Sequence, residues 1–366
     1  MLRRAVRWSE FTMIPSERHI EYACYFDFCR LCHTKRCESA TISSPPTYAG
    51  NHSSIFPRCS SQTSPIRESP HMIRTLQLLT CTGILLTLAC CQSVNAKQAE
   101  SDSWTWEEGI VYATPDGESL ALNMARPKSA SSPRPAILCI HGGGFRAGKR
   151  ESYDGLCKKL AEKGFVAVTI TYRLAPKHPF PAAVHDSKAA VRWLRANAAK
   201  YNIDPSKIGV TGSSAGGHLA QFLGVTANVP EFEGTDGTPK QPSNVNCVVN
   251  VYGPSDFTKS YGKSVDAHEV LPLWFGGNLE THRQRHILGS PLYWVTPDAA
   301  PTLCIHGTED KYVDHEQAVW MIDKLKAAGV EAELLTMQGA GHGFKGADAE
   351  KAEKALLDYF QSRLKP

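Results

Sequence analysis

The feature of the sequence that most constrains the fold is a regular alternation of short apolar segments with longer amphipathic ones, which runs from residue 107 to the C-terminus. Short apolar runs bounded by turn residues are typical of buried strands, and apolar residues at intervals of three and four are typical of helices that cover a sheet. We expect strands at 109–113, 119–126, 136–140, 165–172, 207–211, 247–252, 302–306 and 332–337, and helices at 153–163, 182–200, 215–227, 315–328 and 347–364. The pattern predicts an α/β fold, with a mostly parallel sheet covered by helices on both faces.

The sequence GSSAG at 212–216 joins an expected strand to the helix expected at 215–227. It is a GxSxG pattern with Ser214 in the nucleophile position, and it forms a sharp strand-to-helix turn that only small neighbouring residues tolerate. So short a pattern also recurs by chance, and it needs support from other residues. A serine hydroxyl requires a base, and a group that orients the base, because it is a poor nucleophile at neutral pH.

Two later residues meet this need. Asp310 follows the strand expected at 302–306, in the sequence HGTED, and His342 lies in the glycine-rich turn GAGHGF between the last strand and the last helix. Each residue alone is typical of a turn or of the surface. Their order after Ser214, however, is that of the α/β-hydrolase arrangement, and each of the three follows a strand. We therefore interpret Ser214 as the nucleophile, Asp310 as the orienting acid and His342 as the general base and acid.

A further glycine-rich sequence, HGGG at 141–144, follows the strand expected at 136–140. Glycines let backbone N–H groups approach the oxyanion that forms when an ester carbonyl is attacked. We assign this oxyanion-hole role to the N–H groups of Gly143, Gly144 and Ala215. Such a loop can also cradle a phosphate, but no Gly-Lys-Ser/Thr follows it, which argues against nucleotide binding.

Other residues have competing interpretations. Asp314, four residues after Asp310, is the second choice for the acid. Asp186 and Asp256 precede the position that the chain order requires, and we expect them to cap helices or loops. His218 lies on the helix that follows Ser214, where packing is the simpler explanation.

Two stretches interrupt the alternation. Residues 229–244 are rich in proline, glycine and acidic residues, which predicts a surface loop. Glu231, Glu233 and Asp236 carry the oxygen ligands that calcium prefers, although a solvated acidic loop is the simpler interpretation.

Residues 253–301 form a larger insertion beyond the end of a strand, where side walls of a substrate pocket are expected. We choose Tyr172, Trp274 and Phe275 as candidate pocket walls, with the core as the alternative for each.

The N-terminal part differs in composition from the rest. Residues 72–96 have a basic residue near the start, an apolar middle and the small-residue exit Val94-Asn95-Ala96, which is the layout of a secretory signal peptide. Their apolar run is too short and too rich in threonine for a stable membrane span. A lipid anchor at Cys90 is the alternative to cleavage after Ala96. We therefore predict an exported protein, periplasmic or extracellular.

A signal peptide does not function behind 71 residues, so we interpret 1–71 as sequence upstream of a start at Met72, or as a disordered extension. The alternative is a zinc module at the four cysteines Cys24, Cys29, Cys32 and Cys37, whose spacing is a loose match. Residues 97–366 then form a single catalytic domain that contains the insertion at 253–301. Its cysteines, Cys139, Cys157, Cys247 and Cys304, lie mostly in apolar strand-like runs, and we expect free thiols.

The distribution of charge along the chain limits the classes of partner that we expect it to bind. The formal net charge is +4, but residues 1–74 carry ten basic and six acidic residues, so residues 75–366 are neutral overall. A neutral body argues against nucleic acid or an anionic membrane surface as the partner.

Several longer stretches resemble a known family: HGGGF, YRLAPKHPFPAAVHDSKAAVRWLRAN, DPSKIGVTGSSAGGHLA, VYGPSDF, HGTEDKYVD and GAGHGF. They are similar to the α/β-hydrolase esterases, most closely the branch with feruloyl and acetylxylan esterases and small carboxylesterases, and they cover nearly everything from Pro135 onward. The sequence is also similar to the hormone-sensitive-lipase branch. It departs from that branch in having strands where a helical N-terminal cap is usual, and HGTED where the acid usually follows a DPL pattern.

The resemblance implies an ester hydrolase that uses Ser214, Asp310 and His342 and needs no metal or cofactor. Together with the expected export, it implies small-molecule esters or acetyl and feruloyl groups on polysaccharides as substrates. The alternatives in this fold are a serine peptidase, an acyltransferase or a binding module that has lost catalysis. Peptidases of this kind depend on a large accessory domain, and a binding module usually lacks the serine or the histidine.

Overall fold

A computed structural model describes residues 99–100 (backbone only), 103–129, 131–227 and 229–366. The chain divides into two units, Met1–Cys81 and Thr82–Pro366, and all described residues belong to the second. The predictions for 1–71, for the signal peptide at 72–96, for Cys90 and for the zinc module therefore lie outside the described residues. Among the residues that are described, no helix is both long and apolar enough to cross a membrane.

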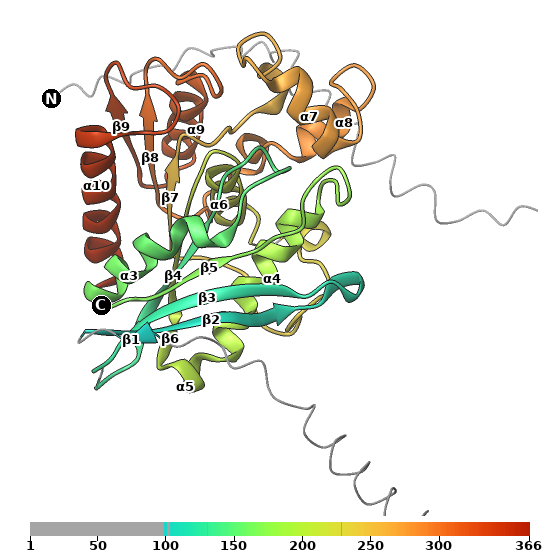
Figure 1. Ribbon diagram of the computed structural model, residues 1–366. Coiled ribbons are helices and arrows are strands. Elements are labelled where there is room, and N and C mark those ends of the chain that lie inside the picture. Colours follow the sequence, from blue (N-terminus) through green and yellow to red (C-terminus); the bar gives the residue numbers. More distant parts are fainter. Residues whose placement is uncertain (1–98, 101–102, 130, 228) are drawn as a thin grey trace, which may run out of the picture. The chain divides into compact units, whose positions relative to one another are not determined.

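In the described part of the chain, nine strands form one sheet in the order β1-β2-β3-β5-β4-β6-β7-β8-β9 (Figure 1). The strands are β1 (Ala99–Glu100), β2 (Trp104–Ala113), β3 (Leu120–Pro127), β4 (Arg134–Ile140), β5 (Val166–Ile170), β6 (Ile203–Ser213), β7 (Cys247–Val251), β8 (Thr302–Gly307) and β9 (Ala332–Met337). Pairs β1–β2, β2–β3 and β3–β5 are antiparallel, and every pair from β5 to β9 is parallel. The carboxyl ends of β4 to β9 therefore meet at one edge, so residues that follow these strands are brought together.

Helices connect the strands and cover the sheet. The α-helices are α3 (Asp154–Glu162), α4 (Ala182–Ala196), α5 (Ala198–Tyr201), α6 (Ala215–Val225), α7 (Ala267–Phe275), α8 (Arg283–Leu288), α9 (Glu316–Ala327) and α10 (Gly346–Leu364). Short 3-10 turns lie at Pro115–Gly117, Arg150–Tyr153, Pro230–Phe232, Phe257–Lys259 and Pro291–Trp294. The insertion at 253–301 contains α7 and α8, and Figure 1 shows both at the end of the molecule to which the β8 and β9 arrows point.

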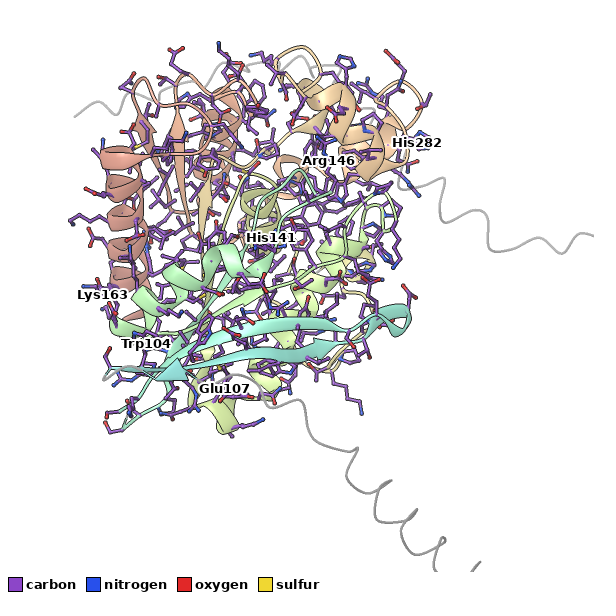
Figure 2. All side chains as sticks on the ribbon, viewed as in Figure 1. Trp104, Glu107, His141, Arg146, Lys163 and His282 are labelled. Atoms are coloured by element: carbon purple, nitrogen blue, oxygen red, sulfur yellow. The ribbon has the colours of Figure 1, made fainter. Side chains whose placement is uncertain are left out.

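The two faces of the sheet bury separate apolar cores. Along β4, Leu138 and Ile140 belong to the core beneath α4 and α6, whereas Ile137 and Cys139 belong to the core beneath α3 and α10. This alternation follows from the period of two in a strand. With side chains drawn, the space between the sheet and its helices is filled (Figure 2). The predicted mostly parallel sheet with helices on both faces is confirmed.

The start of β2 differs from the prediction because Gly109 forms a bulge within the strand and does not mark its beginning. The strand predicted at 109–113 begins earlier, at Trp104. The pairing of β2 with β3 shifts between Glu107 and Ile110, and Gly109 lies in this bulge with φ 72°. Its N–H donates to Asn123 Oδ1 at 3.0 Å. Gly109 therefore bends the strand in its middle and does not start it.

The helix predicted at 182–200 is interrupted at Asn197, which separates α4 from α5. The Asn197 side chain donates to the carbonyl oxygen of Trp193 at 2.9 Å. Such a local bond competes with the helical hydrogen bonds of the backbone. The next turn ends at Asn202, whose left-handed conformation leads the chain into β6.

The acidic loop at 229–244 is anchored to α4 by ion pairs. Lys188 Nζ lies 2.6 Å from Glu233 Oε1, and Arg192 Nη1 lies 3.2 Å from Glu233 Oε2. Both basic side chains are buried. Because cations of the protein itself occupy this carboxylate, the structure gives no support to a calcium site at Glu231, Glu233 and Asp236.

The structure confirms free thiols at Cys139, Cys157, Cys247 and Cys304, and all four are buried. Burial raises the pKa of Cys247 and of Cys304 to about 12. Thiols with so high a pKa stay protonated and unreactive at neutral pH, so these cysteines contribute to packing.

The core beneath α10 leads to a stability prediction. Phe360 is fully buried, and a Cβ added at Gly209 of β6 would lie 2.8 Å from its ring. We expect Phe360→Ala to lower the free energy of unfolding in urea by about 3 to 5 kcal/mol, because it leaves a cavity between helix and sheet.

The control is Asp358→Ala on the same helix. Asp358 forms an exposed pair with Lys354, so a change below about 0.5 kcal/mol is expected. Equal losses in the two variants would contradict the assignment of Phe360 to the core.

Candidate active site

Ser214 lies at a strained turn between β6 and α6. Its φ is 54° and its ψ is −121°, a conformation that non-glycine residues rarely adopt. Two backbone hydrogen bonds hold the turn: Ser214 N–H donates to Val251 O, and His218 N–H donates to Ser214 O, both at 2.9 Å. The structure thus shows the sharp turn that the GxSxG pattern predicts.

The glycines on either side of Ser214 permit close backbone packing. A Cβ at Gly216 would lie 2.0 Å from Ile140 O and 2.6 Å from His141 O. A Cβ at Gly212 would lie 2.4 Å from the backbone of Gly216. Larger residues at these two positions would therefore push α6 away from β4.

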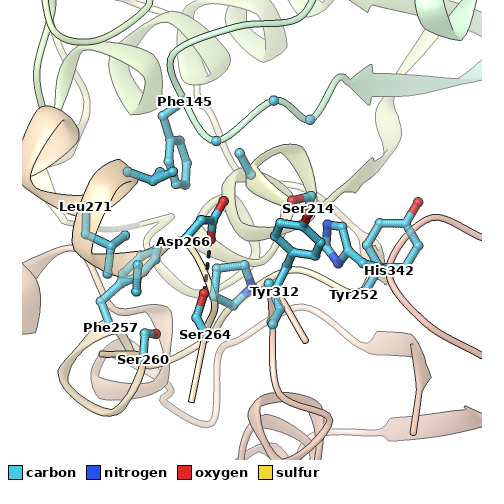
Figure 3. A pocket seen from close by; sticks show the side chains of 18 of the residues that line it. Phe145, Ser214, Tyr252, Phe257, Ser260, Ser264, Asp266, Leu271, Tyr312 and His342 are labelled. Carbon is cyan, nitrogen blue, oxygen red and sulfur yellow. Dashed lines mark hydrogen bonds between the residues drawn. The ribbon is translucent and has the colours of Figure 1, made fainter. Parts of the chain in front are cut away.

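Asp310 and His342 are hydrogen-bonded to each other. His342 Nδ1 lies 2.7 Å from Asp310 Oδ2, and the carboxylate is buried. Asp310 follows β8 and His342 follows β9, as the sequence predicts. His342 and Ser214 line the same cavity, and Figure 3 shows the His342 ring beside Ser214.

The Asp310 carboxylate has further donors within its own loop. The N–H groups of Tyr312 and Val313 each donate to Oδ1 at 2.9 Å, and His306 Nε2 lies 3.3 Å from Oδ2. Burial alone would raise the pKa of Asp310, but the hydrogen bonds from His306, His342 and Val313 outweigh it and hold this pKa well below its ordinary value. Asp310 is therefore ionised at neutral pH and accepts only, so His342 Nδ1 carries a proton.

His306 contacts the Asp310 carboxylate, and sequence reasoning did not predict this contact. His306 is buried, and its Nε2 also lies 2.8 Å from Val313 O. Because both neighbours of Nε2 are acceptors, Nε2 carries the proton. His306 precedes Asp310 by four residues in HGTED, and its position within the buried strand β8 was the available signal.

Two tyrosines flank the His342 ring. The ring centroid of Tyr252 lies 4.6 Å from that of His342, and the centroid of Tyr312 lies 5.3 Å from it. Tyr252 also hydrogen-bonds the hydroxyl of Ser213, as does Tyr153. Both serines of the motif line the cavity, but their partners differ: Ser213 is held by tyrosines, whereas Ser214 lies beside His342.

The glycine loop after β4 lines the same cavity. Gly143 and Gly144 have φ values of 118° and 59°, and a Cβ at Gly143 would lie 2.2 Å from Ala147 O. Gly143 O accepts from the N–H groups of Arg146 and Ala147, which closes a tight turn. Ala215 is the first residue of α6, where N–H groups have no acceptor within the helix. Gly143, Gly144 and Ala215 remain our candidates for the oxyanion hole.

The predicted pocket walls Tyr172, Trp274 and Phe275 were wrong: all three are core residues, and none lines the cavity. The Tyr172 ring stacks on His141 at 4.3 Å, and its hydroxyl donates to His141 O. Trp274 stacks on Phe145 at 3.7 Å. Trp274 therefore supports the wall residue Phe145 from one layer further inside the core.

The rival acids have other partners. Asp186 forms a buried ion pair with Arg173 at 2.8 Å, and Asp256 accepts from the N–H of Thr258, as expected for a cap. Asp314 accepts from the N–H of Glu316 and pairs with Lys263.

His218 is fully buried among aromatic rings, with Nδ1 3.1 Å from Pro254 O, and burial lowers its pKa to about 3. It therefore packs as a neutral side chain, as predicted.

The cavity at Ser214 has a volume of about 490 Å³. Ser214 and His342 lie on its wall. The apolar lining includes the buried residues Phe145, Phe257, Ala267, Val270 and Leu271, and the polar lining includes Ser260, Lys263, Ser264, Asp266, Asp314 and Gln317. Among the polar residues, Lys263, Ser264, Asp266 and Asp314 are partly or fully exposed, and we call the side of the cavity that they form its mouth. Sequence reasoning missed these residues, because the insertion and the Asp310 loop supply most of them.

Within the described residues, no group of three or more His, Cys, Asp or Glu side chains is arranged to hold a metal ion.

Comparison with known proteins assigns the family. Residues 122–325, more than half of the chain, match the BD-FAE family. The chain belongs to the BD-FAE family. Esterase LipC of Mycobacterium tuberculosis is 34% identical over 255 residues, which are 66% of this chain and 60% of LipC. Ethyl acetate hydrolase of Pseudomonas putida is 30% identical over 260 residues, 68% of this chain and 79% of that protein. The chain spans less than two thirds of the length of LipC.

Solved structures agree with this BD-FAE assignment. A truncated form of a carbohydrate esterase from gut microbiota superposes with a TM-score of 0.65 and 30% identity, covering 74% of this chain and 100% of that one. Esterase 2 of Thermogutta terrifontis with bound butyrate gives a TM-score of 0.60 and 27% identity, covering 74% and 94%. The predicted α/β-hydrolase fold and the resemblance to esterases are confirmed.

The low pKa of Asp310 leads to a prediction about stability and pH. Its folded pKa is depressed below the unfolded value of about 3.9, so its contribution is fully present above that value and is lost as pH falls toward the folded pKa. We expect the difference in unfolding free energy between the wild type and Asp310→Asn to shrink by about 0.5 to 1 kcal/mol from pH 5 to pH 3.5.

Urea denaturation at the two pH values measures this difference. Asp358→Asn, at an exposed carboxylate, is the matched control and should show a smaller change. A constant difference for Asp310→Asn would mean that the carboxylate is not held in its ionised form.

Proposed function

We propose that the chain is a serine carboxylesterase that hydrolyses short-chain esters through an acyl-enzyme. The observation that carries the proposal is the hydrogen bond from His342 to the buried, ionised Asp310, beside Ser214 on the wall of one cavity. The relatives named esterases and carboxylic ester hydrolases support the reaction class.

The hydrogen bond between His342 and Asp310 supports a path for the proton in the proposed reaction. Asp310 holds the proton of His342 on Nδ1, which leaves Nε2 as an acceptor for the hydroxyl proton of Ser214. As Ser214 Oγ bonds to the ester carbonyl carbon, His342 takes that proton and becomes an imidazolium, which Asp310 stabilises. His342 then gives the proton to the leaving alcohol, and the acyl group stays on Ser214.

The carbonyl oxygen becomes negative in this step. In our proposal the N–H groups of Gly143, Gly144 and Ala215 donate to it, and the position of Ala215 at the first turn of α6 adds the positive end of the helix dipole. A water molecule deprotonated by His342 then attacks the acyl-enzyme, and the carboxylic acid is released.

The lining of the cavity supports a short acyl group. Phe145, Phe257 and Leu271 are almost fully buried and close its inner end. One relative is named for ethyl acetate, and one structural neighbour binds butyrate.

The alcohol half of the natural substrate is the finer part of the proposal. Two structural neighbours are described as a carbohydrate esterase and as a bifunctional GH43-CE protein. We propose acetyl or feruloyl groups on polysaccharides, reached by export through the segment at 72–96.

The first test identifies the nucleophile. We expect Ser214→Ala to reduce hydrolysis of p-nitrophenyl acetate by about 10³-fold or more, because it removes the attacking atom. A fluorophosphonate should add to the Ser214 peptide of the wild type with loss of fluoride, and mass spectrometry should find no adduct in the variant.

The matched control is Ser213→Ala, which changes the neighbouring serine that Tyr153 and Tyr252 bind. It should keep most of the activity and the adduct. Undiminished hydrolysis by Ser214→Ala would refute the proposal.

The second test concerns the acyl group. The ratio of kcat/KM for p-nitrophenyl octanoate to that for the acetate should be low in the wild type and should rise about ten-fold in Leu271→Ala, which lengthens the buried end of the cavity. Leu273→Ala on the same helix, which does not line the cavity, is the control. An unchanged ratio in Leu271→Ala would place the acyl group elsewhere.

A further inference from the structure

Two exposed apolar side chains lie in the segments that supply the polar lining of the cavity. Tyr312, which lines the cavity, is 49% exposed, and Val265 is 64% exposed. Val265 lies between the lining residues Ser264 and Asp266, and its N–H donates to Lys311 O at 3.0 Å. That bond joins the insertion to the Asp310 loop, so the two apolar groups come from segments that are tied together at the mouth.

Polar groups lie next to these apolar ones. Ser264 Oγ donates to Asp266 Oδ1 at 3.0 Å, and Figure 3 shows the other oxygen of Asp266 pointing away from Ser264. Across the mouth, Lys263 Nζ pairs with Asp314 Oδ2 at 3.3 Å. Ser264, Asp266, Lys263 and Asp314 all line the cavity and present both donors and acceptors.

The two ends of the cavity suit different halves of an ester. Phe145, Phe257 and Leu271 are at most 4% exposed, and Figure 3 shows them gathered away from Tyr312 and His342. A cavity of about 490 Å³ closed by such residues takes a small acyl group and leaves no room for a chain of sugars. The alcohol must therefore leave through the mouth, past Tyr312.

We propose that Tyr312, with Val265 and the polar groups of Ser264, Asp266, Lys263 and Asp314, forms a binding subsite for a sugar ring on the alcohol side of the ester. A pyranose has an apolar C–H face and a rim of hydroxyls. The ring of Tyr312 offers a flat apolar surface for the face, and the polar groups offer partners for the rim. The proposal rests on the esterase function given above and makes Tyr312 a determinant of alcohol specificity.

The test compares two substrates that release the same acid. Ethyl acetate has a small alcohol with no ring, whereas acetylated xylo-oligosaccharides present a pyranose, and acetate release measures both reactions. A p-nitrophenyl ester is unsuitable here, since its aromatic leaving group would itself stack on Tyr312. The wild type should hydrolyse both substrates, with a lower KM per acetyl group for the oligosaccharides.

Tyr312→Ala should raise KM for the oligosaccharides about ten-fold, with little change in kcat, so that the ratio of kcat/KM for the oligosaccharides to that for ethyl acetate falls about ten-fold. Tyr312→Phe keeps the ring and should retain the low KM. Tyr293→Ala, at a tyrosine that is 44% exposed and does not line the cavity, is the matched control and should leave both substrates unaffected.

The outcomes separate this proposal from the one it rests on. If Tyr312→Ala lowers kcat/KM equally for both substrates, Tyr312 acts by positioning His342. If KM for the oligosaccharides does not change, Tyr312 contacts no sugar. Either result overturns the subsite. A wild type that cleaves ethyl acetate but not the oligosaccharides overturns the subsite and leaves the esterase function standing. A wild type that cleaves neither ethyl acetate nor p-nitrophenyl acetate overturns the esterase function itself.

Discussion

The site depends on a backbone-to-backbone contact between the end of β4 and the first turn of α6. Gly216 approaches Ile140 and His141 so closely that even a methyl group would overlap their carbonyl oxygens. Ser214 is attached to α6, and the glycine loop at 141–144 is attached to β4. Their separation is therefore set by close packing of the main chain. In the reaction that we propose, the nucleophile and the oxyanion donors need such fixed spacing.

The parallel part of the sheet brings the remaining groups to the same place. β6, β8 and β9 each deliver one polar residue at their carboxyl ends, and β4 delivers the glycine loop. Separate apolar cores pack against both faces of the sheet, so these ends keep their relative positions. The insertion at 253–301 then adds the cavity wall without taking part in the sheet. In the reaction we propose, the residues that follow the strands carry out the chemistry, and the insertion determines which substrate fits the cavity.

The positions of Ser214, Asp310 and His342 after their strands were predictable because their signals are local: small residues in a turn, or a polar residue directly after an apolar run. The strands were predictable for the same reason, and the main error, the start of β2, came from reading the bulge glycine Gly109 as a boundary. The pocket walls were not predictable. Whether Trp274 contacts substrate or supports Phe145 depends on how α7 packs, which residues distant in the sequence decide. Tyr312 was missed although it lies two residues after Asp310, since nothing local distinguishes an exposed aromatic from a buried one.

The unequal attachment of the acid and the base has a consequence for the reaction cycle. Asp310 is bound by two N–H groups and by His306 within its own segment, so it is preorganised before any ester arrives. His342 lies among the glycines Gly339, Gly341 and Gly343, and its Nδ1 is tied to Asp310. In the reaction that we propose, the carboxylate would therefore stay in place while the imidazole turns between the serine and the departing alcohol. Little reorganisation energy would then be required of Asp310, and the small motion of each turnover would be confined to His342.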